Sequence, residues 1–302
     1  MVMKRETARA LDIVAGVVLT LAAIGYIVFL LIGREGFDYS YIAESYPLFL
    51  GAAKLTIYAT TVSFVAGLGI GFLVGWARTA RAIPIKKILA DRRRLRESAA
   101  ANGGAPDIAL TGVLVSSGTK HALRRMADGY VEMIRGTPLF VQIIFAWSIL
   151  LVFYHPAGFE WIAGIAAMTL NTGAYQSEIF RAGLQTVHSG QVEAGRALGL
   201  SRWRAMRYVV LPQALRLVIP PLTNEYIGLL KASSLLFVIG IQELTYVGKN
   251  QAFVSAHVFE VFALLTGIYF LMTVPVSKVI EYVERRYRIP GLGIQQARTR
   301  AV

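Results

Sequence analysis

The chain has 302 residues, of which 55% are hydrophobic and 16% are charged, and its mean hydropathy is +0.54. This composition excludes a soluble domain and predicts an all-α integral membrane protein. The absence of cysteine excludes disulfides, thiolate metal sites and cysteine nucleophiles. The formal net charge is +13, but the basic residues lie in particular loops, a pattern typical of membrane topology that argues against a nucleic-acid partner.

The first predicted membrane span is the apolar run from Ile13 to Gly33, which is long enough to cross the hydrocarbon layer. A cleaved signal peptide is the alternative, because a short basic segment precedes the run. The run is longer than a signal core, however, and no clear small-residue cleavage site follows it. Residues 1–48 are therefore expected to form an extra N-terminal helix and an external link, with a mildly acidic linking segment from Arg34 to Lys54.

The second predicted span, Leu55–Trp76, carries a stripe of glycines. Gly67, Gly71 and Gly75 recur every four residues, so they lie on one face of a helix and allow another helix to approach closely. Packing within the same chain is the simpler interpretation, and contact with a second subunit is the alternative.

A polar and basic insertion follows between residues 81 and 125. It contains the amphipathic stretch Ile85–Glu97, and the segment Lys120–Ile134 is expected to form a surface helix. Because positive charge marks the cytoplasmic side, this insertion is predicted to be cytoplasmic. Its arginines are expected to meet anionic membrane lipids rather than nucleic acid.

Four further spans are predicted, at Pro138–Tyr154, Trp161–Arg181, Pro221–Gly240 and Val261–Ile280. Gln242–His257 is expected to be an outer loop, and residues 283–302 form a basic tail. About six transmembrane helices result, with both termini cytoplasmic. The segments richest in arginine then all lie on one side of the cell membrane.

A polar island, Ser189–Pro212, separates two of these spans and predicts two short helices. Ser189 and Ser201 are suited to cap them, and Gly199 stands where the first helix ends. Glu193 is expected in the first turn, where the helix dipole favours a carboxylate, and Pro212 is expected to end the second helix. The pair predicts a rigid projection at the membrane surface that meets another protein.

The island resembles the EAA loop of ABC-importer permeases. The residues that match its spacing are Glu193, Ala194, Gly195, Gly199, Val209, Leu211 and Pro212. Gly195 replaces the second alanine of the motif and Val209 replaces an isoleucine. The flanks YVEMIRGTPLFVQ, LNTGAYQSEIFRAGLQTV and LPQALRLVIPPLTNEYIGLLKASSL resemble the polar amino acid uptake family, which handles histidine, glutamine, glutamate, arginine and opines.

This resemblance implies a type I ABC-importer permease domain over residues 49–282, including the coupling loop 189–212. ATP and Mg would be bound by a separate pair of ATPase subunits, and the chain itself has no P-loop motif. The other implied partners are a second permease subunit, either a copy or a paralogue, and an extracytoplasmic solute-binding protein. The resemblance assigns Glu193 to the joint with the ATPase, close approach to Ala194, Gly195 and Gly199, and membrane anchoring to Leu211 and Pro212. A simple helix-dipole role is the alternative for Glu193.

Two series of polar residues inside the spans are candidates for the substrate pathway, because buried polar groups in membranes tend to face an interior cavity. The first is Asn171, Thr172, Tyr175 and Glu178, and the second is Asn224, Glu225, Lys231, Ser233 and Ser234. The second follows Pro220 and Pro221, which can unwind a helix. An ion pair between Glu178 and Arg181 is the alternative role for Glu178, and Lys231 can instead extend to the membrane surface.

Catalytic and metal sites are not expected, and neither is a cofactor. The four histidines, His121, His155, His188 and His257, are scattered through loops, and the chain has no Gly-x-Ser-x-Gly elbow. Three other functions remain open: an ABC permease for another small solute, a secondary transporter driven by an ion gradient, and a membrane-anchored scaffold.

Overall fold

The computed structural model describes residues 37–79, 109–153, 157–186 and 189–287, together with 19, 25 and 26. Within these residues the chain forms helices joined by short turns, and they contain no strand. Most of the first predicted span, residues 80–108 of the basic insertion and the tail beyond residue 287 lie outside the described residues.

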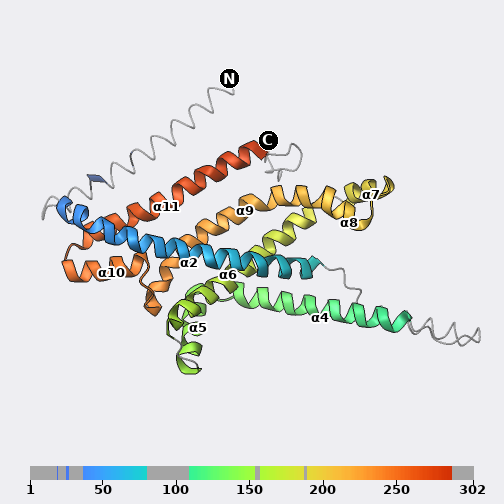
Figure 1. Ribbon diagram of the computed structural model, residues 1–302, viewed down its shortest axis with the longest axis horizontal. Coiled ribbons are helices and arrows are strands. Elements are labelled where there is room, and N and C mark those ends of the chain that lie inside the picture. Colours follow the sequence, from blue (N-terminus) through green and yellow to red (C-terminus); the bar gives the residue numbers. More distant parts are fainter. Residues whose placement is uncertain are drawn as a thin grey trace, which may run out of the picture.

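Helices α2 (Tyr39–Thr79) and α6 (Phe159–Thr186) pack along one another at the centre of the bundle (Figure 1). The glycine stripe of α2 faces α6. A Cβ atom added at Gly71 would lie 2.6 Å from the Cβ of Gln176, and one added at Gly75 would lie 2.7 Å from the carbonyl oxygen of Ser177. Side chains larger than hydrogen do not fit at these separations, so the glycines set the close approach of the two helices within the chain.

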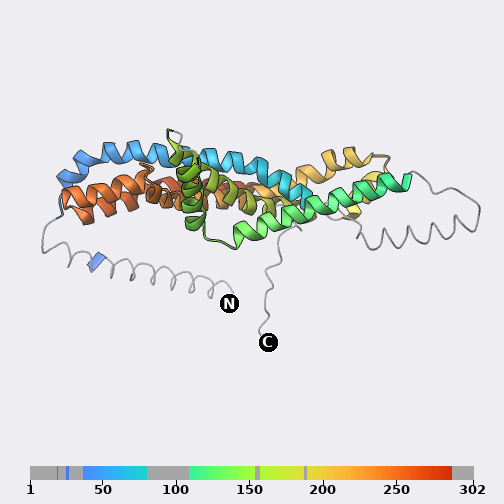
Figure 2. The ribbon, with the colours of Figure 1, turned by 90° about the horizontal axis from the view of Figure 1, so that it is seen from below.

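Helices α4 (Ala109–Arg135) and α5 (Leu139–Phe153) meet at a bend of 105°. Pro138 lies in the bend, and a proline disfavours helical geometry in the residue before it. The Nε2 of Gln142 donates back across the bend to the carbonyl oxygen of Ile134 (2.7 Å) and to the Oγ1 of Thr137 (2.8 Å). These hydrogen bonds hold α5 at a steep angle to α4 (Figure 2).

A nearly continuous helical run follows the turn at Gly199. It comprises α8 (Arg202–Ala205), the π-helical turn η1 (Met206–Val210), α9 (Leu211–Ala232) and the 3₁₀-helix η2 (Ser233–Ile239). Pro212 was expected to end a helix, which is wrong: it lies in the first turn of α9, directly after the π-helical turn η1, and the helical run continues through it. Pro220 and Pro221 likewise lie inside α9 without unwinding it.

The end of the bundle opposite α7 (Ser189–Ala197) and α8 is formed by α10 (Leu244–Ser255) and the first turns of α11 (Val258–Tyr287) (Figure 1). Glu243 is buried and caps α10 by accepting hydrogen bonds from the backbone N–H groups of Thr245 (2.9 Å) and Tyr246 (2.8 Å). Burial raises the pKa of Glu243 to about 7.

Several helices extend beyond the apolar runs that predicted them. The link Arg34–Lys54 is largely helical, because α2 begins at Tyr39, where the Oδ1 of Asp38 accepts from the N–H of Ser40 (2.9 Å) and caps it. The outer loop predicted at Gln242–His257 contains α10, and the helix predicted at Lys120–Ile134 begins at Ala109. Hydrophobicity marks the part of a helix that lies in hydrocarbon, whereas capping residues and turns mark its ends.

Within the described residues, three helical runs are long and apolar enough to cross a membrane: Tyr39–Thr79, Trp203–Ile239 and Val258–Val279. A fourth results if the bent α4–α5 pair counts as one span. Helix α6 does not reach this hydropathy, because polar residues such as Asn171, Thr172 and Gln176 occupy its buried face. The count of six spans stays a prediction.

Candidate functional site

The polar island folds into a projection, here called the knob (residues 189–210), at one end of the bundle (Figure 1). Gly199 ends α7 with a left-handed backbone (φ +85°), as the sequence predicted. The backbone N–H of Leu200 donates to the carbonyl oxygen of Gly195 (3.1 Å) across this turn. Ser201 begins the second helix, its Oγ accepting from the N–H of Arg204 (3.3 Å).

The two halves of the knob pack against each other through Gly195. A Cβ atom at this position would lie 3.4 Å from the Cδ1 of Leu200 and 3.7 Å from a methyl group of Val209. Ala205, on the second helix, is fully buried in the same contact region. Gly195 and Val209 therefore join the two helices of the knob, and this internal contact makes the projection a rigid unit.

Glu193 is exposed on the outside of the knob. It lies beyond the first turn of α7, contrary to the prediction, and the helix dipole acts mainly on groups in the first turn. The dipole therefore explains Glu193 less well than the sequence suggested. Large apolar side chains are exposed on the same knob, with Leu198 86% and Trp203 71% exposed.

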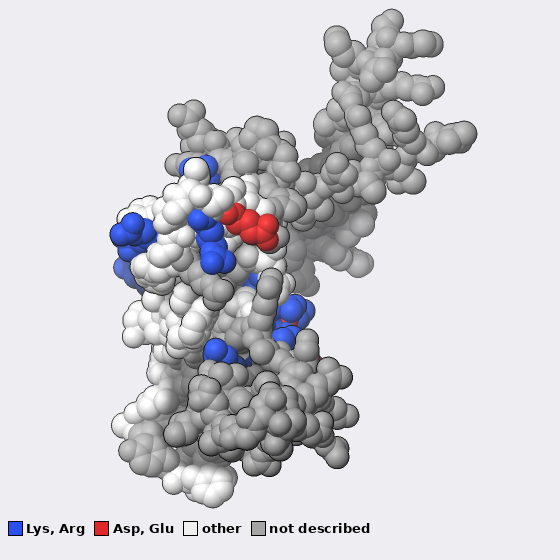
Figure 3. Space-filling model, turned by 90° about the vertical axis from the view of Figure 1, so that its right-hand side faces the viewer, with Lys and Arg blue, Asp and Glu red and all other residues white. Residues whose placement is uncertain are grey.

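Basic side chains gather around a small acidic patch at this end of the molecule (Figure 3). Among the knob residues whose exposure the structure describes, the exposed arginines are Arg196, Arg204 and Arg207. Exposed apolar groups within a charged rim are typical of a protein interaction surface.

The knob lies between α6 and α9 in the chain. Helix α7 begins three residues after α6 ends, and η1 continues directly into α9 at Leu211 and Pro212, both of which are exposed. A π-helical turn of this kind is often found at functional sites. Helices α6 and α9 also pack against each other in the bundle.

The two predicted polar series meet where α6 contacts α9. The Oγ1 of Thr172 donates to Glu225 Oε1 (3.0 Å) and accepts from the Nε2 of Gln176 (3.2 Å). Gln176 is fully buried, and its Oε1 is the buried side-chain atom without a hydrogen-bond partner among the described residues. A chain of polar groups thus crosses the α6–α9 contact.

Asn171 connects this region to the α4–α5 bend, because its Nδ2 donates to the Oε1 of Gln142 (2.9 Å). Neither Gln142 nor Gln176 was predicted as a site residue. Gln176 follows Thr172 by four residues, so helical spacing could have identified it. Gln142 lies on a different helix, and no sequence spacing connects it to Asn171.

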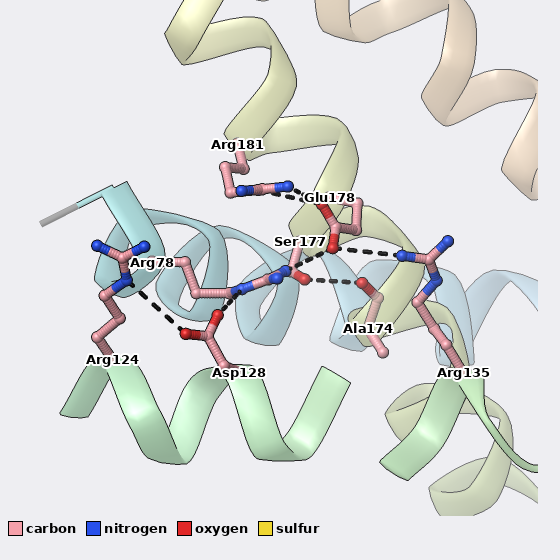
Figure 4. Close-up of polar contacts among 8 residues, drawn as sticks. All are labelled: Arg78, Arg124, Asp128, Arg135, Ala174, Ser177, Glu178 and Arg181. Carbon is pink, nitrogen blue, oxygen red and sulfur yellow. Dashed lines mark hydrogen bonds and ion pairs between the residues drawn. The ribbon is translucent and has the colours of Figure 1, made fainter. Parts of the chain in front are cut away.

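Glu178 lies in an ion-pair cluster that joins three helices (Figure 4). Its Oε1 contacts Arg78 Nη1 of α2 (2.7 Å) and Arg135 Nη1 of α4 (3.3 Å), and its Oε2 contacts Arg181 Nη2 (2.9 Å). The ion pair between Glu178 and Arg181, which the sequence suggested as the alternative to a pathway role for Glu178, is therefore present. The guanidinium of Arg135 also lies over the ring of Tyr175, 5.4 Å from its centroid.

The other members of the second series have different surroundings. Ser233 is buried and donates to the carbonyl oxygen of Leu230 (2.7 Å), and Ser234 is half-buried. Asn224 and Lys231 are exposed. Glu225 is thus the member of the second series whose side chain accepts a hydrogen bond from Thr172, a member of the first series.

Membrane-length helices, a polar contact between α6 and one of them, and a projecting knob define an integral membrane protein with a surface suited to a partner. The model of the family of binding-protein-dependent transport system inner membrane components matches residues 108–289. The chain belongs to this family.

GlnP and NocM are two of the relatives that this chain matches over nearly the whole of their own length. The glutamine transport system permease protein GlnP of Escherichia coli (strain K12) is 33% identical over 256 residues, which cover 84% of this chain and 99% of GlnP. The nopaline transport system permease protein NocM of Agrobacterium fabrum is 31% identical over 283 residues, which cover 87% and 99%.

A crystal structure of an amino acid ABC transporter with histidines has a similar fold, with a TM-score of 0.65 and 30% sequence identity. The match covers 82% of this chain and 98% of that chain. The helix order and the knob described above are thus the arrangement of a permease-type chain.

Proposed function

We propose that this chain is the permease subunit of an ATP-binding-cassette importer and forms the translocation pathway for a polar amino acid. One observation carries this function: the knob lies between α6 and α9, the two helices that the Thr172–Glu225 hydrogen bond connects. Displacement of the knob therefore moves both sides of the polar contact. The amino acid and opine permeases among the relatives support the same substrate class.

In this mechanism a pair of ATPase subunits binds ATP and receives the knobs of two permease subunits. Glu193 and Ala194 lie on the exposed side of α7, available to the ATPase. The Gly195–Val209 contact keeps the knob rigid, so a push on α7 reaches α9 without being absorbed by bending. Leu211 and Pro212 carry the displacement into the membrane-length helix. The bundle then alternates between inward-facing and outward-facing arrangements.

The polar contact suits a zwitterion. The ammonium group of an amino acid needs hydrogen-bond acceptors, which the Glu225 carboxylate and the Gln176 Oε1 supply. The substrate carboxylate needs donors, and the Asn171 amide, which donates one N–H group to Gln142, provides a second in the same region. The choice among amino acids is made in large part by a separate solute-binding protein.

The knob and both termini lie on the cytoplasmic side of the cell membrane in this assignment, since the basic segments mark that side. Residues 49–282 form the permease domain, preceded by an additional N-terminal helix. An ion-gradient-driven transporter is not favoured, because such a protein needs no coupling knob.

Substitution of Glu193 by lysine tests the coupling role. The permease, its ATPase subunit and its binding protein are reconstituted in vesicles, and amino acid uptake and ATP hydrolysis are measured together. Glu193→Lys reverses a charge on the exposed face of α7, so uptake per ATP hydrolysed is expected to fall steeply. Glu44→Lys is the matched control, because Glu44 is an exposed glutamate in α2, before the second predicted span.

Equal coupling in the Glu193→Lys and Glu44→Lys proteins would remove the role assigned to Glu193. Uptake by vesicles that contain the permease alone, without ATP, would overturn the ABC-importer function itself.

A further inference from the structure

Arg78, in the last turn of α2, connects this helix to two others (Figure 4). Its Nε contacts Asp128 Oδ1 of α4 and its Nη1 contacts Glu178 Oε1 of α6, both at 2.7 Å. Because the planar guanidinium directs its N–H groups outward in a fixed fork, one side chain can bind a carboxylate on each of two helices. The Arg78 side chain is only 10% exposed, so salt screens these ion pairs less than it screens exposed ones.

Helix α4 is attached to the bundle over a short stretch. In the part of α4 whose side chains the structure describes, residues 119–126 are exposed or half-buried, and the buried side chains lie between Ala127 and Ile134. This stretch packs against α2 and α6. Asp128 lies at its beginning, so the ion pair with Arg78 fixes α4 at the point where its contact with the bundle starts.

Helix α6 connects this junction to the knob. Glu178 lies between Thr172, which forms the polar contact with α9, and Thr186, where α6 ends before the knob. A displacement of the knob that α6 follows therefore reaches Glu178 before it reaches Thr172. The two ion pairs of Arg78 pass this displacement to α2 and, through Asp128, to α4.

Helix α6 also holds α5, on the other side of the α4–α5 bend. The Nδ2 of Asn171 donates to the Oε1 of Gln142 in α5 (2.9 Å). Arg135, beside the bend, contacts Glu178 at 3.3 Å, but its side chain is 45% exposed and its ion pair is longer than those of Arg78. The bent pair can follow α6 as one body only if its α4 arm is fixed to α6 as well, and the shorter, less exposed contacts at Arg78 supply that attachment.

We propose that Arg78 is a positioning residue for transport: by binding Asp128 and Glu178 together, it keeps α2, α4 and α6 in one arrangement while the knob moves. Helix α5 then moves with the polar contact between α6 and α9. This inference rests on the proposed importer function. It assigns to Arg78 no contact with the substrate or with the ATPase.

Substitution of Arg78 by glutamine tests this role. The full-length permease is reconstituted in vesicles with its ATPase subunit and its binding protein, and uptake per ATP hydrolysed is measured. Without the two ion pairs α6 moves independently of α4, so the ratio should fall by roughly tenfold, the factor expected for one lost hydrogen bond between charged groups. A merely structural role predicts a different result: less permease would fold, uptake and hydrolysis would fall together, and the ratio would not change.

Arg124→Gln is the matched control. It removes the same charge from the same cluster, but the contact between Arg124 and Asp128, at 3.7 Å, lies within α4 and joins no second helix. Uptake per ATP hydrolysed should therefore equal that of the parent protein.

Asp128→Ala removes the link between α2 and α4 and leaves the Arg78–Glu178 ion pair in place. It should lower the ratio by itself, and it carries the test alone if the Arg78→Gln protein does not fold. Combined with Arg78→Gln it should cause no further loss, because Arg78→Gln already breaks the same contact.

Three results would overturn the role of Arg78: equal ratios for Arg78→Gln and Arg124→Gln, a parental ratio for Asp128→Ala, or a double variant whose loss is the product of the two single losses. Uptake by the parent protein with and without ATP is measured in the same vesicles and tests the importer function separately. The positioning role can therefore fail while the importer function stands.

Discussion

Gly71 is a position where the packing of α2 on α6 leaves no room for a side chain, and substitution by alanine tests that packing directly. The added Cβ would lie 2.6 Å from the Cβ of Gln176, 3.1 Å from the carbonyl oxygen of Gly173 and 3.1 Å from the backbone nitrogen of Ser177. None of these atoms can rotate away, because they are a Cβ or belong to the backbone. The two helices must therefore move apart.

The expected cost follows from two opposing terms. Overpacking of a close contact destabilises a protein by about 1–3 kcal/mol. Alanine in place of glycine stabilises a helix by about 1 kcal/mol, which offsets part of this cost. We expect a net loss of about 1 kcal/mol, the middle of the resulting range of about 0–2 kcal/mol, together with slower transport, because α6 carries Thr172.

Gly69→Ala is the matched control on the same helix. Gly69 is exposed, and an added Cβ there meets nothing within 4 Å, so this substitution should leave stability unchanged or raise it. The midpoints of thermal unfolding are measured in the same detergent for the two variants and the parent protein, and uptake is measured in reconstituted vesicles. Equal midpoints for Gly71→Ala and Gly69→Ala would refute the close α2–α6 packing described above.

Two further predictions concern the carboxyl groups of Glu225 and Glu243. Glu225→Gln keeps an acceptor for Thr172 but loses the charge, so the KM for a polar amino acid should rise by roughly tenfold or more, the factor expected for a lost charged hydrogen bond. Arg216→Gln, at an exposed position of the same helix, should not change KM; an unchanged KM for Glu225→Gln would separate Glu225 from the substrate. The raised pKa of Glu243 means that the folded protein retains a proton that the unfolded chain loses, so stability should fall as pH rises from 4.5 to about 7. Glu243→Gln should flatten this dependence of the unfolding midpoint on pH, and an unaltered slope would show that another group causes it.

The class of the fold and the position of the knob were predictable from local sequence. Apolar runs identified the helices now labelled α2, α5, α6, α9 and α11, because the cost of exposing backbone in hydrocarbon leaves the chain few alternatives. Gly199 identified the end of α7, because a left-handed backbone there strongly favours glycine. The glycine spacing identified the face of α2 that another helix approaches.

Element boundaries were less predictable. The sequence suggested that Pro212 ends a helix, yet the chain passes through it after a π-helical turn and continues to Ala232. Helix α10 lay unrecognised in a predicted loop, because its stability depends on the Glu243 cap and on packing against α11 rather than on an apolar run. Caps and tertiary contacts decide where such helices begin and end.

Helical spacing by itself determined which polar residues share a face, such as Asn171, Tyr175 and Glu178 on α6. It did not determine which residues face them from other helices. Only the tertiary structure brought Thr172 to Glu225, and Glu178 to Arg78 and Arg135, across separations of 53, 100 and 43 residues. The physical reason is that the period of one helix sets directions about its own axis, whereas partners depend on how the helices pack, and that packing is set by contacts such as the glycine stripe of α2 against α6.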